Sequence, residues 1–236
     1  ELNLLNWSDV DGWFKLFQPN VVIIAAAKVG GIGANSKSPA DFLLENLKIQ
    51  NNIIETSWKT GVKRLLFLGS SCIYPKHVQQ PIKEEYLLNG LLERTNDCYA
   101  IAKIAGLKLC ESLNIQYGFD AITLMPTNLY GPNDNYDYEN SHVMASLLNK
   151  FSLASKNSYP TVQCWGTGKP FREFLHVDDL SEAIVFALEN WDPNDINAPK
   201  DENGNKLYHL NVGTGEDISI KELASKISKA TNFKGD

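Results

Sequence analysis

Three short apolar runs constrain what this chain can fold into more than any other feature of its sequence. They cover residues 21–27 (VVIIAAA), 64–69 (RLLFLG) and 121–125 (AITLM). A strand that is apolar along its whole length is expected in a parallel sheet that is covered on both faces. Helical patterns lie between these runs, so the sequence predicts an α/β fold built on a doubly wound parallel sheet.

Local signals predict where the helices begin and end. Ser38 is a capping residue, Pro39 fits the first helical position, and Gly61 can close the helix that follows. Residues 219–222 (SIKE) form a capping box before a helix that reaches residue 230. Further helices are expected over residues 99–113, 141–154 and 178–189.

The glycine cluster at residues 30–33 (GGIG) follows the first apolar run, and no amphipathic helix is expected directly after it. Two interpretations fit this cluster. It is a loop at the carboxyl end of a strand, where substrates bind in such sheets, or it is a simple turn.

Composition and charge exclude several classes of function. The net charge is −6, with 22 basic and 28 acidic residues, so a broad basic face for nucleic acid is not expected. No apolar run approaches the roughly 20 residues of a membrane helix. The four cysteines show no C-x-x-C pairing, which favours reduced thiols in a cytosolic enzyme; they are Cys72, Cys98, Cys110 and Cys164.

Tyr99 and Lys103 are the strongest candidates for chemistry. Their spacing of four places both side chains on one face of a helix. A neighbouring ammonium favours the phenolate, so we expect Lys103 to lower the pKa of Tyr99 from its usual value of about 10. The pair can then act as a general acid or base on a carbonyl or hydroxyl. An exposed tyrosine and lysine would produce the same pattern.

Polar residues follow two of the predicted strands. Ser70 and Ser71 end the second apolar run, and residues 125–132 (MPTNLYGP) end the third. The carboxyl ends of parallel strands face the ligand crevice, so the serine hydroxyls are expected near a substrate carbonyl and Tyr99. A strand-ending turn is the alternative for both serines.

Longer motifs resemble the extended short-chain dehydrogenase/reductase family. They include AAAKVGGI (25–32), LGSSCIYP (68–75), YAIAK (99–103), NSHV (140–143), WGTGKPFREFLHVDD (165–179) and NVGTG (211–215). Within that family they are most similar to enzymes that epimerise carbons 3 and 5 of GDP-4-keto-6-deoxy-D-mannose and reduce carbon 4 with NADPH. The resemblance implies a Rossmann-like cofactor domain over residues 1–132 and a smaller α/β substrate-binding part over 133–236. Residues 174–190 and 208–215 are expected to return to the first domain.

The resemblance also implies catalytic roles. Cys72 would be the base and His142 the acid that invert the two carbons, since both groups can titrate near neutrality when their surroundings shift them. Tyr99 would protonate the oxygen at carbon 4, Ser70 would stabilise that oxygen, and Lys103 would tune Tyr99 and bind the nicotinamide ribose. A buried structural thiol is the alternative for Cys72, and a helix-start residue bonded to backbone is the alternative for His142.

Binding residues follow from the same resemblance. Arg172 would hold the GDP diphosphate, or pair with Glu173; Trp165 would pack on guanine or ribose, or belong to the core. Lys150 occupies a position where the family often has a basic substrate contact. Asp178 and Asp179 are interpreted as a structural helix cap. The expected contacts to NADP(H) are Leu68, Gly69, Ser70, Ser71, Lys103, Pro126, Thr127, Asn128, Leu129, His142, Asn3 and Leu4.

Two other functions stay open. One is another nucleotide-sugar 4-epimerase or a 4,6-dehydratase, although a dehydratase is expected to have an acidic residue where this chain has Cys72. The other is a non-catalytic, cofactor-sensing relative, which would usually lack the tyrosine–lysine pair. Family analogy predicts a cytoplasmic homodimer that forms through helices 41–58 and 99–113, whose apolar stripes equally suit packing on the sheet.

The start of the sequence lacks the strand, glycine-rich turn and helix that hold a pyrophosphate in such sheets. Relative to the family, we expect the chain to begin after that unit and to stop within the substrate-binding part. A sheet without its central strand leaves neighbouring strands unpaired. These residues alone are therefore expected to lack a stable monomeric fold and to bind NADPH weakly; a sharp two-state melt of the isolated chain would contradict this.

Overall fold

The computed structural model describes residues 2–137 and 141–236. Its larger sheet has the order β1-β2-β3-β6 and is parallel throughout. The strands are β1 (Val21–Ile24), β2 (Arg64–Leu68), β3 (Ala121–Pro126) and β6 (His209–Val212). The predicted parallel, doubly wound α/β fold is therefore confirmed, although β1 is shorter than the apolar run that predicted it.

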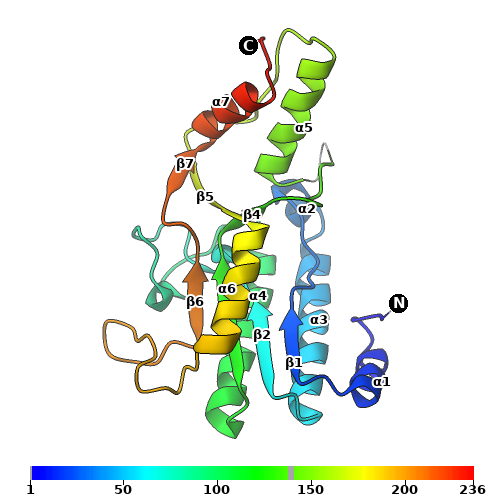
Figure 1. Cartoon of the computed structure of the whole chain (residues 1–236), viewed down its shortest axis with the longest axis vertical. Helices are drawn as coiled ribbons and strands as arrows, with labels where there is room; N and C mark the ends of the chain where they lie inside the picture. The colour runs from blue at the N-terminus through cyan, green and yellow to red at the C-terminus, as the bar shows by residue number, and fades with distance from the viewer. Residues whose placement is uncertain (1, 138–140) are drawn as a thin grey trace.

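Helices lie on both faces of this sheet (Figure 1), and the two central strands, β2 and β3, are mostly apolar and buried. The edge strand β1 is less well covered, since Val21 and Ile23 are about half exposed. Leu65 and Phe67 of β2 pack into one cluster with α1 (Trp7–Phe17), α3 (Pro39–Lys59) and α4 (Asp97–Tyr117). Leu66, which lies between them in sequence, packs on the other side with Ala187 of α6 (Val177–Asn190). Successive side chains of a strand point to opposite faces, so all three positions are fully buried.

A second, three-stranded sheet lies beyond the carboxyl ends of the first (Figure 1). Its strands are β4 (Asn128–Tyr130), β5 (Phe171–His176) and β7 (Asp217–Ser219). β5 pairs in parallel with β4 and antiparallel with β7. Two further helices, α5 (Val143–Lys156) and α7 (Ile220–Ala230), pack together through a separate apolar cluster that includes Phe151 and Ile227.

The helix boundaries correct several expectations. The capping box of α7 is present, with Ser219 and Glu222 exchanging hydrogen bonds as predicted. Ser38 does precede α3, but its side chain makes no capping bond. Asp178 and Asp179 lie in the first turn of α6, where they complement the helix dipole, while the side chain of His176 provides the cap itself.

Two short helices were not expected. The six-residue helix α2 (Ile32–Lys37) follows the glycine cluster directly, and it is too short to show the amphipathic pattern that the sequence analysis looked for at that point. α1 was also missed, and it begins where the side chain of Asn6 accepts a hydrogen bond from the Ser8 amide. Two 3-10 turns complete the described elements, η1 (Ser71–Ile73) and η2 (Glu84–Tyr86). Within the described ranges, no helix is both long enough and apolar enough to cross a membrane.

Gly106 allows α4 to approach the sheet and α3 closely. A Cβ atom at this position would lie 2.7 Å from Cζ of the Phe67 ring and 2.9 Å from Cδ of Gln50. Gln50 is 2% exposed and donates to the carbonyl of Ala102, one turn earlier in α4. Neither neighbour can move without disturbing a fully packed region.

We therefore expect Gly106→Ala to lower the free energy of unfolding by about 1–3 kcal/mol through overpacking. The loss outweighs the gain of about 1 kcal/mol that alanine usually brings to a helix interior. Gly12→Ala in α1 is the matched control, because no atom lies within 4 Å of the added Cβ. The control should raise stability, and urea unfolding midpoints that move in the same direction for both variants would contradict the packing argument.

Candidate active site

The end of β2 forms the first part of the candidate site. The Gly69 amide donates to the carbonyl of Leu124 in β3 at 2.8 Å, which joins the two strand ends. A side chain at position 69 would collide with Met125, so glycine is required by close packing. Ser70 then begins η1, and its hydroxyl accepts a bond from the Cys72 amide at 3.4 Å. Cys72 is thus held one short turn beyond the strand.

Lys103 connects this turn with α4. Its side chain is 4% exposed, and its ammonium donates to the carbonyl of Leu68 at 2.8 Å. The nitrogen lies 4.7 Å from the ring centre of Phe67 and 5.8 Å from that of Tyr99. The alternative of an exposed tyrosine and lysine is therefore wrong for Lys103, which is buried at the carboxyl edge of the sheet.

Burial shifts the pKa values of Lys103, Cys72 and Tyr99 in the directions that favour their neutral forms. It lowers the pKa of Lys103 to about 8, against the opposing effect of the Cys72 charge. It raises the pKa of Cys72 to about 11, although the Ser70 hydrogen bond and the Lys103 charge act in the other direction. Burial and the Cys72 charge also raise the pKa of Tyr99. The expectation that Lys103 lowers the pKa of Tyr99 is therefore wrong, because burial outweighs any such effect.

The turn that carries Cys72 has a second anchor, which the sequence did not reveal. The hydroxyl of Tyr74 donates to Oδ1 of Asn211 at 2.7 Å, and the Asn211 amide donates to Glu84 at 2.8 Å. Asn211 lies in β6, so the network ties η1 to the far strand of the sheet. Burial and the nearby Glu84 charge raise the pKa of Tyr74, which keeps it a hydrogen-bond donor.

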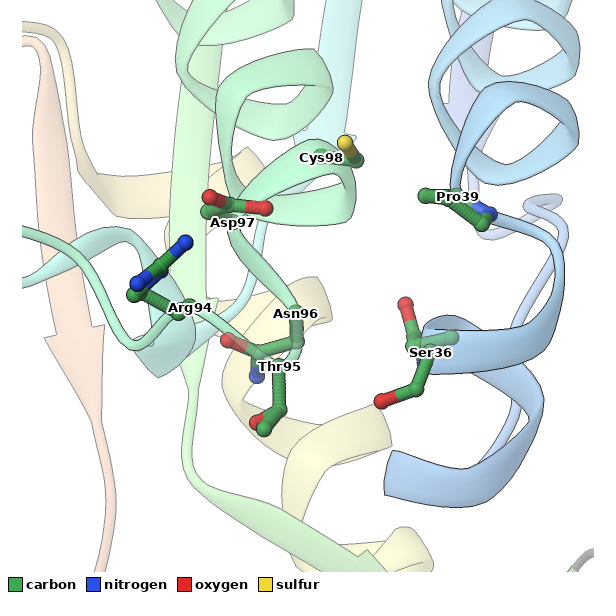
Figure 2. Close-up of a pocket in the computed structure, with 8 residues that line it drawn as sticks. Ser36, Pro39, Arg94, Thr95, Asn96, Asp97 and Cys98 are labelled. Carbon is green, nitrogen blue, oxygen red and sulfur yellow. The ribbon is translucent and has the colours of Figure 1, made fainter.

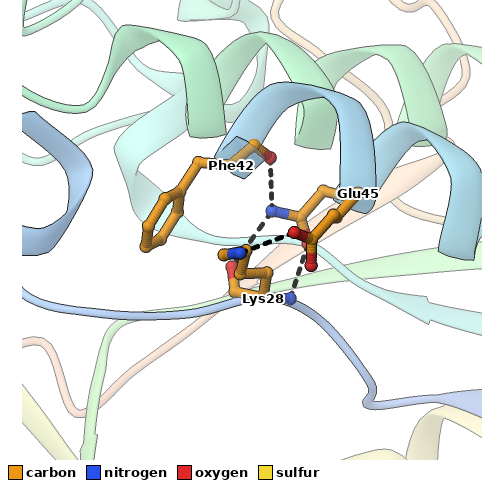
Figure 3. A network of polar contacts seen from close by, with 4 residues as sticks. Lys28, Phe42 and Glu45 are labelled. Carbon is orange, nitrogen blue, oxygen red and sulfur yellow. Dashed lines mark hydrogen bonds and ion pairs between the residues drawn. The ribbon is translucent and has the colours of Figure 1, made fainter. Parts of the chain in front are cut away.

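The loop after β1 is fixed to α3 at the same edge of the sheet (Figure 3). Asn46 accepts from the Lys28 amide at 2.8 Å and donates to the carbonyls of Lys28 and Phe42. The Lys28 ammonium lies 2.6 Å from Glu45. The loop that leads to the glycine cluster therefore has a defined path.

Residues 126–129 form the third strand end. The Thr127 amide donates to the carbonyl of Val212, and the side chains of Thr127 and Asn128 both donate to the carbonyl of Glu173 at 2.9 Å. Leu129 pairs with Leu175 in the second sheet. These bonds place the proposed cofactor-binding segment where the two sheets meet.

The other predicted site residues, which are His142, Lys150, Trp165 and Arg172, make separate contacts of their own. His142 is an exposed N-cap of α5 whose side chain makes no capping bond, and Asn140 of its motif lies outside the described residues. The Lys150 ammonium lies 4.4 Å from the ring centre of Trp165, whose side chain is 68% exposed and is therefore not a core aromatic. Arg172 is exposed and donates to the Phe171 carbonyl; its ion pair with Glu173 is not formed.

The described contacts gather Ser70, Cys72, Tyr99 and Lys103 into one cluster. None of these contacts joins His142 or Arg172 to that cluster. Asn3 and Leu4 are placed elsewhere. Asn3 accepts from the Leu5 amide, and the Leu4 carbonyl accepts from Asn52 in the second half of α3.

Comparison with known proteins identifies the class. Residues 1–198 match the NAD dependent epimerase/dehydratase family, and the chain belongs to that family. It is 51% identical over 235 residues to GDP-L-fucose synthase 1 of Arabidopsis thaliana, covering all of this chain and 69% of the relative. It is 50% identical over 243 residues to GDP-L-fucose synthase of Escherichia coli strain K12, covering all of this chain and 72% of the relative.

Solved structures agree with this class. A GDP-D-glycero-L-gluco-heptose synthase from Campylobacter jejuni, determined in the presence of NADPH, superposes with a TM-score of 0.92 at 39% identity. The match covers all of this chain and 77% of that one. The Rossmann-like fold of this family is thus established for the chain, together with its membership of an NAD(P)-dependent enzyme class.

The raised pKa of Cys72 predicts a distinctive pH profile of alkylation. At pH 9 roughly one per cent of a thiol with a pKa of about 11 is ionised, so iodoacetamide should modify the exposed Cys164 well before Cys72. The Cys72 rate should still be rising at the highest pH that leaves the protein folded. Peptide mass spectrometry measures both sites.

Ser70→Ala is the matched variant. The Ser70 hydrogen bond lowers the pKa of Cys72, so removing it should raise that pKa further. We expect it to slow Cys72 alkylation at pH 9.5 and to leave Cys164 unchanged. A Cys72 rate that levels off below pH 9 in the wild type would show that burial does not control this thiol.

Proposed function

We propose that this protein converts GDP-4-keto-6-deoxy-D-mannose to GDP-L-fucose by 3,5-epimerisation and NADPH-dependent 4-reduction. The observation that carries the proposal is the thiol of Cys72 in the same buried cluster as Tyr99 and Lys103. Reduction of a ketone needs a proton donor for the oxygen, which Tyr99 provides. A second proton-exchanging group is needed only if carbon centres are also inverted. The names of the 50–51% identical relatives support the same activity.

The epimerisation requires a base and an acid on opposite faces of the sugar. A ketone at carbon 4 acidifies the protons at carbons 3 and 5, so each centre can lose a proton on one face and regain one on the other. Cys72 takes the proton, since the adjacent Lys103 charge favours its thiolate. His142 returns a proton from the other face, and its exposure at the start of α5 leaves the imidazole open to a substrate.

The reduction uses the same cluster in a second role. Tyr99 remains protonated at neutral pH because burial raises its pKa, so it can donate a proton to the oxygen at carbon 4. Ser70 hydrogen-bonds that oxygen, and Lys103 holds the ring of Tyr99 beside the strand end.

The described residues fit the nicotinamide half of NADPH, which supplies the hydride for carbon 4 when bound. A lysine ammonium has three donors, and the one hydrogen bond described for Lys103, to Leu68, leaves capacity for ribose hydroxyls. Leu68, Gly69, Ser70 and Ser71 would line one side of the cofactor, and residues 126–129 the other. NADPH rather than NADH is supported by the cofactor named for the structural relative.

The GDP moiety would be bound by Lys150, Trp165 and Arg172. Lys150 supports one face of the Trp165 ring, and the exposed remainder of that indole suits stacking on guanine or ribose. Arg172 presents an exposed planar fork of donors, which matches diphosphate oxygens. We further propose that the enzyme is a cytoplasmic homodimer. The four free thiols support the compartment, and the exposed Leu44 and Ile101 on α3 and α4 support the interface.

The proposal predicts that the two half-reactions separate in different variants. The full-length enzyme is incubated with GDP-4-keto-6-deoxy-D-mannose and NADPH in deuterated water, while NADPH loss and deuterium at carbons 3 and 5 are followed. The wild type should consume NADPH and incorporate label at both carbons. Tyr99→Phe should lower NADPH consumption by about 10²–10⁴-fold and retain the label, because only the proton donor is lost. Cys72→Ala should lose the label.

Each alternative outcome identifies a different error. NADPH oxidation without label in the wild type would make the protein a plain C4 reductase and return Cys72 to a structural role. Absence of both signals would reject the substrate and leave only the family. Loss of labelling in Tyr99→Phe as strong as in Cys72→Ala would contradict the division of roles between them.

A further inference from the structure

The motif at residues 211–215 (NVGTG) has no part in the chemistry proposed above, although it begins in β6 and continues past the carboxyl end of the sheet. Its last residue supports the end of β3 indirectly. The Gly215 amide donates to the carboxylate of Glu173 at 2.7 Å, and the carbonyl of Glu173 receives the side chains at the end of β3. Its first residue, Asn211, pairs with Met125 of β3 and faces the segment that follows Cys72.

Three polar groups of Asn211 are bonded to that segment. Its Oδ1 accepts from the Tyr74 hydroxyl at 2.7 Å, its Nδ2 donates to the carbonyl of Ile82 at 3.1 Å, and its amide donates to Glu84 at 2.8 Å. Asn211 lies in a paired strand, so the sheet determines its position. The segment is therefore attached to a rigid element by a single side chain and its amide.

Cys72 lies between two supports in the short turn η1. On the strand side, the Ser70 hydroxyl accepts from the Cys72 amide. On the other side, Ile73 is fully buried and Tyr74 is 5% exposed, and both belong to an apolar cluster that includes Leu107 of α4. The ring of Tyr74 thus packs on the helix, while its hydroxyl attaches the turn to β6 where water has little access.

The far end of the same segment, which runs into α4, is less closely packed. A cavity of about 230 Å³ lies between residues 94–98 and the start of α3. Figure 2 shows Thr95 and Asn96 across this space from Ser36 and Pro39. Because this end borders open space, we expect the bonds to Asn211 at the near end to hold the turn.

The groups assigned to the reduction have supports of their own. The Lys103 ammonium donates to the carbonyl of Leu68 and lies near the rings of Phe67 and Tyr99. These contacts belong to β2 and α4, so the bond between Tyr74 and Asn211 can be lost while they remain. Proton removal from carbon needs a well-placed base, and a displacement of about 1 Å can cost roughly 100-fold in rate.

We propose that Tyr74 and Asn211 are positioning residues for the epimerisation. The hydrogen bond between them holds the turn that carries Cys72, so that the thiol reaches carbons 3 and 5, and the reduction does not depend on it. The inference rests on the proposed function and deepens it.

The test measures epimerisation apart from reduction. The full-length enzyme is incubated in deuterated water with GDP-4-keto-6-deoxy-D-mannose and NADP⁺, which has no hydride to transfer, and deuterium at carbons 3 and 5 is followed. Tyr74→Phe keeps the ring and removes the hydroxyl. It should lower kcat for labelling about 10- to 100-fold and leave unchanged the KM of the keto sugar and the Kd of NADPH, measured by fluorescence. A general loosening of the sheet edge would raise both constants.

Two further variants are compared with Tyr74→Phe. Tyr117→Phe is the matched control, because it removes a hydroxyl that is bonded to Gln116 at the end of α4. It should change none of these values. Asn211→Ala should slow labelling, and its combination with Tyr74→Phe should be no slower than Asn211→Ala alone, because the shared bond is lost only once.

A second measurement needs no substrate. Release of the turn exposes the thiol, so iodoacetamide should modify Cys72 faster in Tyr74→Phe than in the wild type at pH 9.5, with Cys164 unchanged. An unchanged labelling rate in Tyr74→Phe, or a loss of labelling matched by an equal rise in the Kd of NADPH, would overturn the inference. In either case, a wild type that consumes NADPH and labels both carbons leaves the proposed function standing. A wild type that does neither rejects both.

Discussion

A single buried cation organises the catalytic end of this fold. Lys103 is 4% exposed, and the fall of its pKa from 10.5 to about 8 corresponds to a desolvation cost on the order of 3 kcal/mol. The cost is offset by the carbonyl of Leu68 and by the ring faces of Phe67 and Tyr99. Those partners belong to β2 and α4, so the groups that stabilise the ammonium also fix the strand end relative to the helix. The position of Cys72, four residues after Leu68, depends on that arrangement.

Burial and the Cys72 charge together oppose the ionisation of Tyr99. A negative charge on Cys72 raises the pKa of Tyr99, so the phenol keeps its proton while the thiolate is present. Under the proposed mechanism, proton removal by the thiolate therefore does not consume the proton that reduction later requires. The two weak acids can then act in two successive steps of that mechanism, because a charge on Cys72 opposes the ionisation of Tyr99. The order of epimerisation before reduction is consistent with this coupling.

The sequence predicted three of the four strands of the larger sheet, because each of them is a continuous apolar run. β6 was not predicted, since its His209 and Asn211 interrupt the apolar signal. Leu65, Leu66 and Phe67 are all fully buried, and that pattern is visible without any structure. The short helix α2 was missed because its six residues carry no amphipathic repeat, and Tyr74 was missed because its partner Asn211 lies 137 positions away. The wrong direction for the pKa of Tyr99 has a related cause. Spacing shows that Lys103 is near, but it does not show that burial exceeds the effect of a nearby charge.

Hydrogen bonds hold the loops at the carboxyl ends of the strands, so the groups that these loops carry keep fixed positions. Asn46 holds the loop after β1, the Gly69 amide joins β2 to β3, and the Glu173 carbonyl receives two side chains from the end of β3. A ring that is inverted at two carbons must keep its place while protons leave and return, so its contacts need fixed supports. Asn35 adds a further support to the loop after β1, because its amide donates to the carbonyls of Gly30 and Gly31. The glycine cluster, which as a sequence pattern fitted either a loop or a turn, is thus held in place through the carbonyls of its first two residues.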